Sequence, residues 1–351
     1  MIRIAVDAMG GDLAPRAVVE GAYLAAVEDG ISILLVGDRE RVAAEISRLG
    51  DPRGRIEVVH AEEIVGMDDP ATAPLRKKRR SSVRLCAELV HEGRAQAMVT
   101  AGHTGAAMIA AKVVIGTSAG VDRPALAAVV PSAHGRTVLL DVGANVDSKP
   151  NHLREFAVMG HFYAQEVIGT ESPRIGLLSI GEEDNKGSEL TREVFKVLKR
   201  TGLHFVGNVE GGDVFQGTVD VVVCDGFVGN VLLKSAEALA ELLGRMLGEE
   251  IGKSRRTQLG YAILKPAIDR FRSRTDYTEY GAAPLLGVEG GCFIGHGRST
   301  ARAIRNAIRR AVEFSEGRVH EKIRDKLAEL HQQEASLLAT GAGQPEEIPA
   351  R

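Results

Sequence analysis

The alternation of apolar and polar positions over residues 1–115 predicts strands separated by amphipathic helices. Four short apolar runs are typical of buried strands, and the segments between them repeat apolar residues at helical spacing. The predicted strands are 2–6, 31–36, 56–60 and 95–99, and the predicted helices are 17–29, 39–49 and 81–92. Strands that alternate with helices in this way indicate a parallel sheet with right-handed crossovers.

A different connection follows between residues 126 and 141. The apolar runs 126–130 and 137–141 are joined by residues 131–136 alone, whereas a parallel crossover needs about a dozen residues or more. We therefore predict a β-hairpin here, and with it a mixed sheet. Farther along, the pattern predicts helices at 152–166, 188–200, 230–251, 257–272 and 298–316 and strands at 174–180, 203–207 and 219–223.

The chain shows neither an internal repeat nor a clear linker. We therefore predict a single α/β body over residues 1–338, with a helical excursion at about 235–280. Residues 339–351 are mostly small and polar, and we expect a disordered tail there because such a segment buries little apolar surface.

Five of the predicted strands lead into short polar loops that contain glycine. The loops are 7–12, 100–105, 141–145, 181–187 and 225–230. Ligands of open α/β sheets bind beyond the carboxyl ends of parallel strands. Glycine lets the backbone approach a ligand closely, and helix N-termini attract anions. We expect the five loops to converge on one sheet edge and to form a phosphate or carboxylate site.

These loops do not match the common nucleotide motifs. A dinucleotide site needs G-x-G-x-x-G after a strand, and the string DAMGGD at 7–12 lacks that spacing. The string GEEDNKGS at 181–188 differs from the P-loop pattern G-x-x-x-x-G-K-[ST]. His, Cys and carboxylate residues do not cluster with metal-ligand spacing. We therefore predict no metal and no cofactor.

Lys186 and Asn230 are the leading candidates for catalysis in these loops. Lys186 stands just ahead of a predicted helix, where it would meet an anion that the helix end attracts. Asn230 and Asn145 carry amides that can donate hydrogen bonds to a developing oxyanion. His103 and Thr104 lie at another predicted helix N-terminus. Two alternatives stay open: Asn230 only shapes a turn, and Lys186 is an ordinary surface lysine.

Anion donors without an evident protein nucleophile suit a reaction in which the nucleophile is itself an anion. Inorganic phosphate is such a nucleophile. A protein that holds phosphate and a second substrate together can supply about 7–11 kcal/mol of the barrier through orientation. Hydrogen bonds to a carbonyl oxygen that gains charge would add to this.

Composition and charge narrow the class of protein. Hydrophobic residues make up 44% of the 351 residues, which is typical of a globular body, and the formal net charge of −3 argues against nucleic-acid binding. Cys86, Cys224 and Cys292 lack metal spacing and are predicted to be reduced core thiols. The chain begins with an apolar strand and has no long apolar span. We expect a cytoplasmic protein that contacts a membrane only at its surface, if at all.

Nine sequence strings spread along the chain carry a family resemblance. They are DAMGGDLAP (7–15), AGHTGA (101–106), RPALA (123–127), LDVGAN (140–145), GEEDNKGSEL (181–190), GNVEGGD (207–213), DGFVGNVLLK (225–234), YGAAPLLGVEG (280–290) and IGHG (294–297). With these strings, the chain resembles the PlsX family, the acyl-carrier-protein:phosphate acyltransferases of bacterial phospholipid synthesis. The match extends from Asp7 to about Arg310.

The resemblance implies a fold and a reaction. The implied fold is a three-layer α/β/α Rossmann-like mixed sheet, similar to the isopropylmalate dehydrogenase-like and phosphate acetyltransferase folds, in a homodimer. In the implied reaction, inorganic phosphate attacks the thioester of acyl carrier protein. The acyl phosphate formed passes to a membrane glycerol-3-phosphate acyltransferase.

The resemblance also places the site residues. Lys186 matches a family position that we associate with phosphate binding and charge neutralisation, and Asn230 one that we associate with the thioester oxyanion. Candidates for binding phosphate or thioester are Asp7, Gly10, Gly11, His103, Thr104, Gly105, Asn145 and His296. Three positions depart from the family pattern: His103 and Ser179 replace a common Asn, and Arg298 replaces a common Ser.

Basic and apolar surface segments suggest partners. Acyl carrier proteins are acidic, so two basic segments are candidate docking sites, although charge runs are often only solvated helix faces. The docking candidates are Lys77, Lys78, Arg79, Arg255 and Arg256. Leu259 and Ile263 belong to an apolar stripe flanked by basic residues, and Pro266 suggests the tip of a helical hairpin. This stripe either packs in the core or dimer or contacts a membrane.

Two other functions stay open at this point. One is a phosphotransacetylase-like enzyme that uses acyl-CoA. This enzyme would differ from an acyl-carrier-protein:phosphate acyltransferase only in the acyl carrier. The other is a non-catalytic membrane scaffold for fatty-acid synthesis enzymes, which would bind lipid and carrier protein without phosphate-dependent loss of thioester.

Overall fold

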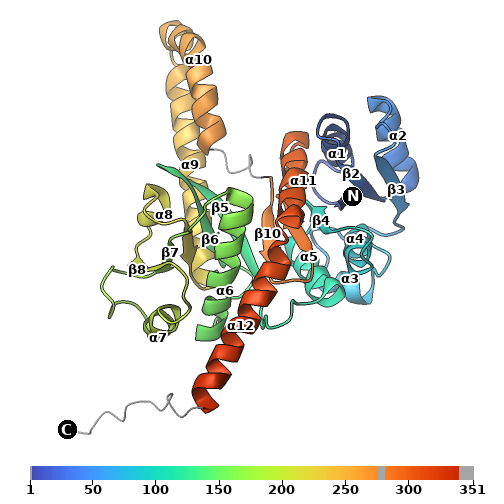
Figure 1. Ribbon diagram of the computed structural model, residues 1–351. Helices are drawn as coiled ribbons and strands as arrows, with labels where there is room; N and C mark the ends of the chain where they lie inside the picture. The colour runs from blue at the N-terminus through green and yellow to red at the C-terminus, as the bar shows by residue number, and fades with distance from the viewer. Residues whose placement is uncertain (1, 276–280, 340–351) are drawn as a thin grey trace, which may run out of the picture.

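The computed structural model describes residues 2–275 and 281–339 and shows one 11-stranded sheet with helices on both faces (Figure 1). The strands lie in the order β3-β2-β1-β4-β11-β10-β5-β6-β9-β7-β8. Their bounds are β1 Arg3–Asp7, β2 Ser32–Gly37, β3 Ile56–His60, β4 Ala97–Thr100, β5 Ala125–Ser132, β6 Gly135–Leu140, β7 Ile175–Leu178, β8 Phe205–Val209, β9 Val221–Val223, β10 Ala283–Leu286 and β11 Gly291–Ile294.

Five of the described helices, α2, α5, α7, α9 and α11, begin after a residue whose side chain accepts a hydrogen bond from a free N–H group of the first turn. Asp38 accepts a hydrogen bond from the N–H of Arg41, and Ser188 accepts one from Thr191, which confirms both predicted helix starts. The helices are α1 Arg16–Glu28, α2 Arg39–Leu49, α3 Ala73–Arg76, α4 Ser82–His91, α5 Thr104–Ala110, η1 Ala111–Ile115, α6 Pro150–Tyr163, η2 Ala164–Ile168, α7 Glu189–Leu198, α8 Asp213–Gln216, α9 Gly226–Gly252, α10 Arg255–Thr275, α11 Ala301–Glu316 and α12 Val319–Ala339.

Strand directions divide the sheet into two halves. The predicted hairpin is confirmed, because β5 and β6 pair antiparallel, and the sheet is mixed. The strands β1 to β4 and β11 run parallel to one another, as do β6 to β9. Between these sets lie β10 and β5, each antiparallel to its neighbours. Three reversals separate the two sets, so the sets run in opposite directions.

The prediction that five loops converge on one sheet edge is therefore wrong. The loops after β1 and β4 lie at the edge where β11 also ends, whereas the loops after β6, β7 and β9 lie at the opposite edge. The sequence pattern did not reveal β10 and β11. Their two apolar runs are only four residues each and stand in a stretch rich in glycine.

The sheet opens between β10 and β5. These strands pair only through Leu285 with Leu126 and Leu286 with Ala125. Beyond this contact, β5 continues to Ser132 paired with β6, while the start of β10 pairs with β11. The helix α9 covers the resulting gap in the sheet.

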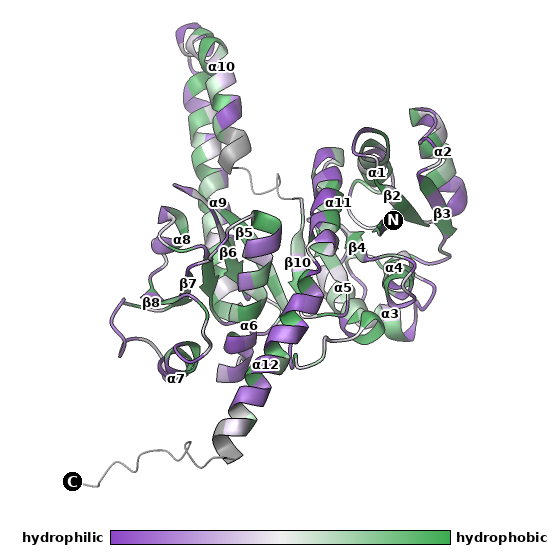
Figure 2. Cartoon of the chain, viewed as in Figure 1, coloured by the Kyte–Doolittle hydropathy of each residue, from purple (hydrophilic) through white to green (hydrophobic). Residues whose placement is uncertain are grey.

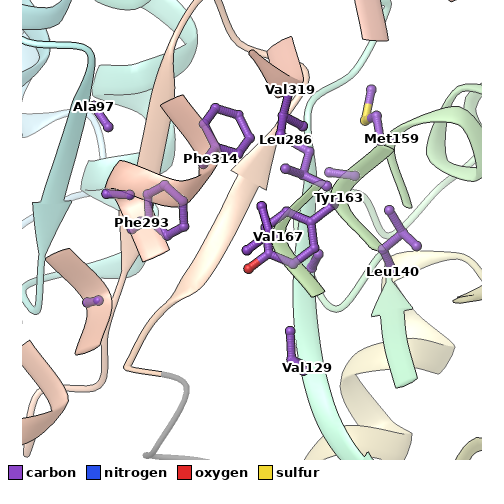
Figure 3. Packing of buried hydrophobic residues seen from close by; sticks show 14 of the residues in the cluster. Ala97, Val129, Leu140, Met159, Tyr163, Val167, Leu286, Phe293, Phe314 and Val319 are labelled. Atoms are coloured by element: carbon purple, nitrogen blue, oxygen red, sulfur yellow. The ribbon is translucent and has the colours of Figure 1, made fainter. Parts of the chain in front are cut away.

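Two hydrophobic clusters, one on each face of the sheet, form the core. One cluster takes residues from α1, α6, α7, α11 and α12, and the other from α4, α5 and α8. In the first cluster, the rings of Phe293 and Phe314 meet edge to face with centroids 5.6 Å apart, and Tyr163 is buried among aliphatic side chains (Figure 3). The predicted three-layer α/β/α fold is confirmed by this arrangement.

The helices α9 and α10 form an antiparallel pair that extends from the body as an arm (Figure 1). Pro266 lies inside the continuous helix α10, so the prediction of a hairpin tip at this residue is wrong; the chain reverses at residues 253–254. A proline removes one backbone donor but does not by itself reverse a chain. The predicted tail at 339–351 lies, beyond Ala339, outside the described residues.

Hydrophobic and hydrophilic residues alternate along the arm (Figure 2). In the residues that the structure describes, no helix is both long and apolar enough to cross a membrane. Large apolar side chains are nevertheless exposed on both helices of the arm: Leu239, Leu242, Leu243, Met246, Leu247, Leu259, Ile263, Leu264 and Phe271.

Glu155 of α6 is a buried carboxyl group that makes stability depend on pH. It accepts hydrogen bonds from the N–H of Asp122 (2.9 Å) and from Asn151 Nδ2 (2.7 Å). Burial raises the pKa of Glu155 from 4.5 to about 7. Its contribution to stability is therefore complete below the ordinary pKa of 4.5 and is lost as pH rises through about 7.

A Glu155→Gln variant is expected to remove this pH dependence, since glutamine is always neutral. Between the two pKa values, the free energy of unfolding of the native protein should fall with rising pH relative to that of the variant. Urea unfolding at a series of pH values measures this difference. Parallel curves for the two proteins would show that Glu155 does not titrate in this way.

Candidate active site

The gap in the sheet and the helix α9 enclose a groove with a cavity volume of about 690 Å³. One face of α9 forms a wall, because residues spaced by three, four, seven and eleven positions share a helix face. These wall residues are Asn230, Leu233, Lys234, Glu237 and Glu241. The other walls come from β5, from the start of β10 and from the residues that follow β11.

At one end of the groove, Asn230 lies beside the loop after β6. A Cβ atom on Gly143 would lie 3.7 Å from the side chain of Asn230, and Gly143 has a φ of +132°, which favours glycine. The first turn of α9 packs tightly on this loop. A Cβ on Gly229 would lie 2.0 Å from the carbonyl oxygen of Asp141. The glycines of the string DGFVGN thus let α9 approach β6 closely enough to place Asn230.

Asp141 organises the loop that faces Asn230. Its Oδ1 accepts hydrogen bonds from the N–H groups of Leu126, Gly143 and Ala144, and its Oδ2 accepts from the backbone N–H and from Nδ2 of Asn145. The pKa of Asp141 is raised by burial, and the hydrogen bonds oppose this shift. Asp141 is therefore a structural residue of the site.

Asn145 is part of the same structural network. Its Nδ2 also donates to the carbonyl oxygen of Pro124 at 2.8 Å, so both amide hydrogens are used inside the protein. The N-terminus of α9 is occupied in a similar way, because Asp225 accepts from the N–H groups of Phe227 and Val228 and the carbonyl of Asn145 accepts from Gly226. In this arrangement, neither Asn145 nor these first N–H groups are positioned to receive a substrate anion.

The loops after β1, β4 and β11 meet at the other end of the groove. Asp7 is buried and accepts a hydrogen bond from Thr100 Oγ1 at 2.7 Å. Burial raises the pKa of Asp7, and this hydrogen bond acts in the opposite direction. The N–H of Asp12 donates to the carbonyl of Gly297 at 2.7 Å. A Cβ on Gly10 would lie 2.7 Å from Asp7 Oδ2. These contacts lock the loops together, so Asp7 and Gly10 have structural roles.

Gly11, Gly105 and His103 also stand in these loops. Gly11 has a φ of +106°, and a Cβ there would lie 3.0 Å from the carbonyl of Gly297. A Cβ on Gly105 would lie 3.0 Å from the Cβ of Ala71. The Nδ1 of His103 accepts a hydrogen bond from the N–H of Ala106 and caps α5. Of the residues predicted in these loops, Thr104 and His296 line the groove.

Lys234, Glu237 and His296 form a charged cluster in the wall of the groove. Glu237 Oε2 is 2.8 Å from Lys234 Nζ, and Glu237 Oε1 is 4.0 Å from His296 Nε2. Burial lowers the pKa of His296, while the charge of Glu237 acts in the opposite direction. Lys234 and Glu237 were not among the predicted site residues, although their helical spacing from Asn230 places all three on one face of the helix.

Lys186 lies at the same sheet edge as Asn230 but does not line the groove. It stands in the loop after β7, the strand next to β9. Its Nζ is 4.0 Å from Glu183 Oε1, and about half of its side chain is exposed. Asn208 donates a hydrogen bond to the carbonyl of Glu183 at 2.8 Å and holds this loop against β8.

The thiols of the chain are poorly placed for chemistry in this groove. Cys86, Cys224 and Cys292 are buried, and burial raises the pKa of all three thiols, that of Cys292 to about 12. The string GTSAG at 116–120 matches the serine-hydrolase pattern G-x-S-x-G. However, Ser118 is buried and follows the helix η1, whereas that pattern requires a strand-to-helix turn.

Metal ligands do not gather in the described part of the chain either, where no group of three or more His, Cys, Asp or Glu residues could hold an ion.

The fold is that of the phosphotransacylases. A phosphotransacetylase from Streptococcus pyogenes shares it with a TM-score of 0.62 and 18% sequence identity, over 90% of this chain and 94% of that chain. A branched-chain phosphotransacylase from Enterococcus faecalis V583 gives a TM-score of 0.54 and 17% identity, over 89% of this chain and 99% of that chain. At these identities the likeness establishes the fold alone.

The chain belongs to the PlsX family of phosphate acyltransferases. The family model described as "Fatty acid synthesis protein" matches residues 2–322. A phosphate acyltransferase from Pelotomaculum thermopropionicum is 51% identical over 326 residues, which cover 93% of this chain and 95% of that protein. One from Geotalea uraniireducens is 50% identical over 344 residues, which cover 97% and 99%. The family resemblance and the class, an acyltransferase of fatty-acid and phospholipid synthesis, are confirmed.

Proposed function

We propose that this chain transfers the acyl group of acyl-[acyl-carrier-protein] to inorganic phosphate and forms an acyl phosphate for phosphatidic acid synthesis. The observation that carries the proposal is the groove in a phosphate acyltransferase chain, with the amide of Asn230 at one end and all three thiols buried away from it. An external oxyanion nucleophile suits such a site. A phosphate oxygen forms the new bond to the carbonyl carbon, the carbon–sulfur bond breaks, and the thiol of the carrier leaves.

In this proposal Asn230 and Lys186 have separate roles. The Nδ2 of Asn230 donates a hydrogen bond to the thioester oxygen as it gains negative charge. Lys186, on the neighbouring loop, neutralises the incoming phosphate. The exposure of Lys186 suits a residue that meets a substrate from solvent, and its distance of 4.0 Å from Glu183 leaves it without a tight ion pair to that carboxylate.

The test is direct detection of the product. Purified protein is incubated with palmitoyl-carrier protein, with and without inorganic phosphate, and any acyl phosphate is trapped with hydroxylamine. We expect trapped product only when phosphate is present. Isolation of a covalent acyl–protein adduct on the productive route would contradict the proposal. Binding of carrier protein and lipid without loss of thioester would favour the scaffold function.

A second candidate is an enzyme that uses acyl-CoA. The observation in its favour is the shared fold, since the solved structures named above are a phosphotransacetylase and a branched-chain phosphotransacylase. The two candidates differ only in the carrier of the acyl group. Presenting palmitoyl-CoA and palmitoyl-carrier protein to the enzyme side by side distinguishes them.

The basic segment near residues 76–80 is our preferred docking site for the acidic carrier. Lys77 and Arg79 are exposed there, whereas Lys78 is engaged with Asp69 at 2.6 Å. This segment lies close to the groove, because Met67 lines the groove and Ala71 packs against the loop that contains Gly105. Arg255 and Arg256 are also exposed, but they stand at the tip of the arm.

The arm is our candidate for peripheral membrane contact and for delivery of the product to a membrane glycerol-3-phosphate acyltransferase. Near its tip, Leu259 and Ile263 are 66% and 73% exposed beside Arg255 and Arg256. Apolar and basic side chains together favour binding to anionic lipid. The exposed leucines of α9 are the surface that we propose for homodimer formation.

Ile263→Glu is expected to weaken binding to anionic liposomes, because it places a charge in the apolar contact. Co-sedimentation with the liposomes measures the effect, and a loss of roughly tenfold in bound protein is the expected size. The matched control is Ile180→Glu, which changes an 80% exposed isoleucine on the body. Equal lipid binding by the native protein and the Ile263 variant would favour packing within a dimer.

A further inference from the structure

The lining of the groove is chemically divided. Its floor consists of aliphatic side chains and methyl groups, while the charged side chains stand along α9 and in the loops at the end near His296. The floor residues come from β5, the loop after β6, β10 and β11: Leu126, Ala128, Val142, Ala283 and Ile294. Leu233 adds an apolar side chain to the wall on α9.

The floor lies where the sheet opens, and the side chains that face each other there are small. Past the short pairing of β10 with β5, Ala128 on one strand and Ala283 on the other both line the opening. Leu126 and Ala128 each keep 9% of their surface exposed, although they belong to the hydrophobic core. Aliphatic surface left in water costs about 25 cal/mol per Å², so an aliphatic occupant would be stabilised there.

The dimensions and charges of the groove favour one class of occupant. Its wall on α9 extends from Asn230 to Glu241, which is about 16 Å at 1.5 Å per residue. Its volume of about 690 Å³ is typical of a small-molecule site. Its charged lining residues are the acids Asp12, Glu237 and Glu241 and the bases Arg298 and Lys234, the last of which is engaged with Glu237. An elongated apolar chain fits the aliphatic part of these walls.

We propose that the groove binds the aliphatic chain of the acyl donor, with the thioester carbonyl at Asn230 and the chain running along α9 toward Ala283. This inference rests on the proposed function, since it supplies the binding site for the acyl group that is transferred. The width of the gap at Ala128 and Ala283 then limits which chains are accepted.

The test compares long and short acyl groups on variants of the groove. Ala128→Leu narrows the gap, and it should lower kcat/KM for palmitoyl-carrier protein roughly tenfold or more while butyryl-carrier protein changes by less than about twofold. Leu233→Ala removes an apolar side chain from the wall of the groove and should likewise lower kcat/KM for the long-chain donor more than for the short-chain donor. Leu233 is half-buried, so this change should not endanger the fold. Ala262→Leu, an equal change at an exposed position on the arm, is the control.

Direct binding provides a readout that does not depend on turnover. A fluorescent long-chain fatty acid should bind the native protein and the Ala262 variant equally, and bind the Leu233 variant several-fold more weakly. Equal losses with both donors, or unchanged fatty-acid binding by the Leu233 variant, would overturn the inference. A native protein that binds the fatty acid but turns over no acyl donor would support the groove and contradict the proposed function.

Discussion

Gly229→Ala is expected to displace α9 from the sheet and to abolish acyl transfer. The new Cβ would lie 2.0 Å from the carbonyl oxygen of Asp141 and 2.8 Å from Cys224 Sγ. The first of these is a backbone atom of a buried loop and cannot rotate away as a flexible side chain can. Overpacking in a rigid site costs about 1–3 kcal/mol or more, and we expect the upper end or beyond.

Gly244→Ala on the same helix is the matched control. A Cβ at that position would meet nothing within 4 Å, so alanine should stabilise the helix by roughly 0.5–1 kcal/mol. Urea unfolding of both variants, followed by the hydroxylamine assay, measures stability and activity together. A Gly229 variant with native stability and activity would show that α9 does not pack on the loop after β6 as described.

Asn230→Ala is expected to lower kcat by about 10²–10³, the usual effect of removing one donor to an oxyanion. Asn230→Asp should be at least as slow, because it keeps the shape of the side chain and replaces the amide donor with a negative charge. Lys186→Ala should chiefly raise the KM for phosphate, because the lysine is exposed and acts on the incoming anion. The hydroxylamine assay under varied phosphate concentration separates these effects.

Ser235→Ala serves as the control for Asn230, since Ser235 is an exposed residue of the same helix that does not line the groove. It should retain native kinetics. Near-normal turnover by both the Asn230 and the Lys186 variants would remove the proposed active site, whereas an unfolded Asn230 variant would be recognised by its changed urea transition.

Local sequence patterns predicted much of the fold. The strands from β1 to β4 and the helices between them follow clear periods, and the short connection at 131–136 correctly indicated the β5–β6 hairpin. The patterns did not predict β10 and β11, which have four residues each and stand in a stretch with many glycines. These two strands join the halves of the sheet, so without them the direction of each half could not be inferred.

The candidate site was predicted only in part, because contacts between residues distant in sequence decide which side chains face the groove. Asn230, Thr104 and His296 were predicted, and all three line the groove. Asp7 and Asn145 were also predicted, but their polar atoms are used within the protein, a fact that depends on contacts distant in sequence. Whether Lys186 and Asn230 act in catalysis stays a prediction.

The helix α9 links the groove and the arm through one rigid element. Its 27 residues span about 40 Å, of which the last 11, after Glu241, reach from the groove to the tip over about 16 Å. Each residue added to or removed from this stretch would shift the tip by about 1.5 Å and rotate it by about 100° about the axis. The length of α9 therefore sets both the distance and the relative orientation of the groove and the tip. Insertions or deletions within this stretch must be close to whole turns if both ends are to keep their orientation.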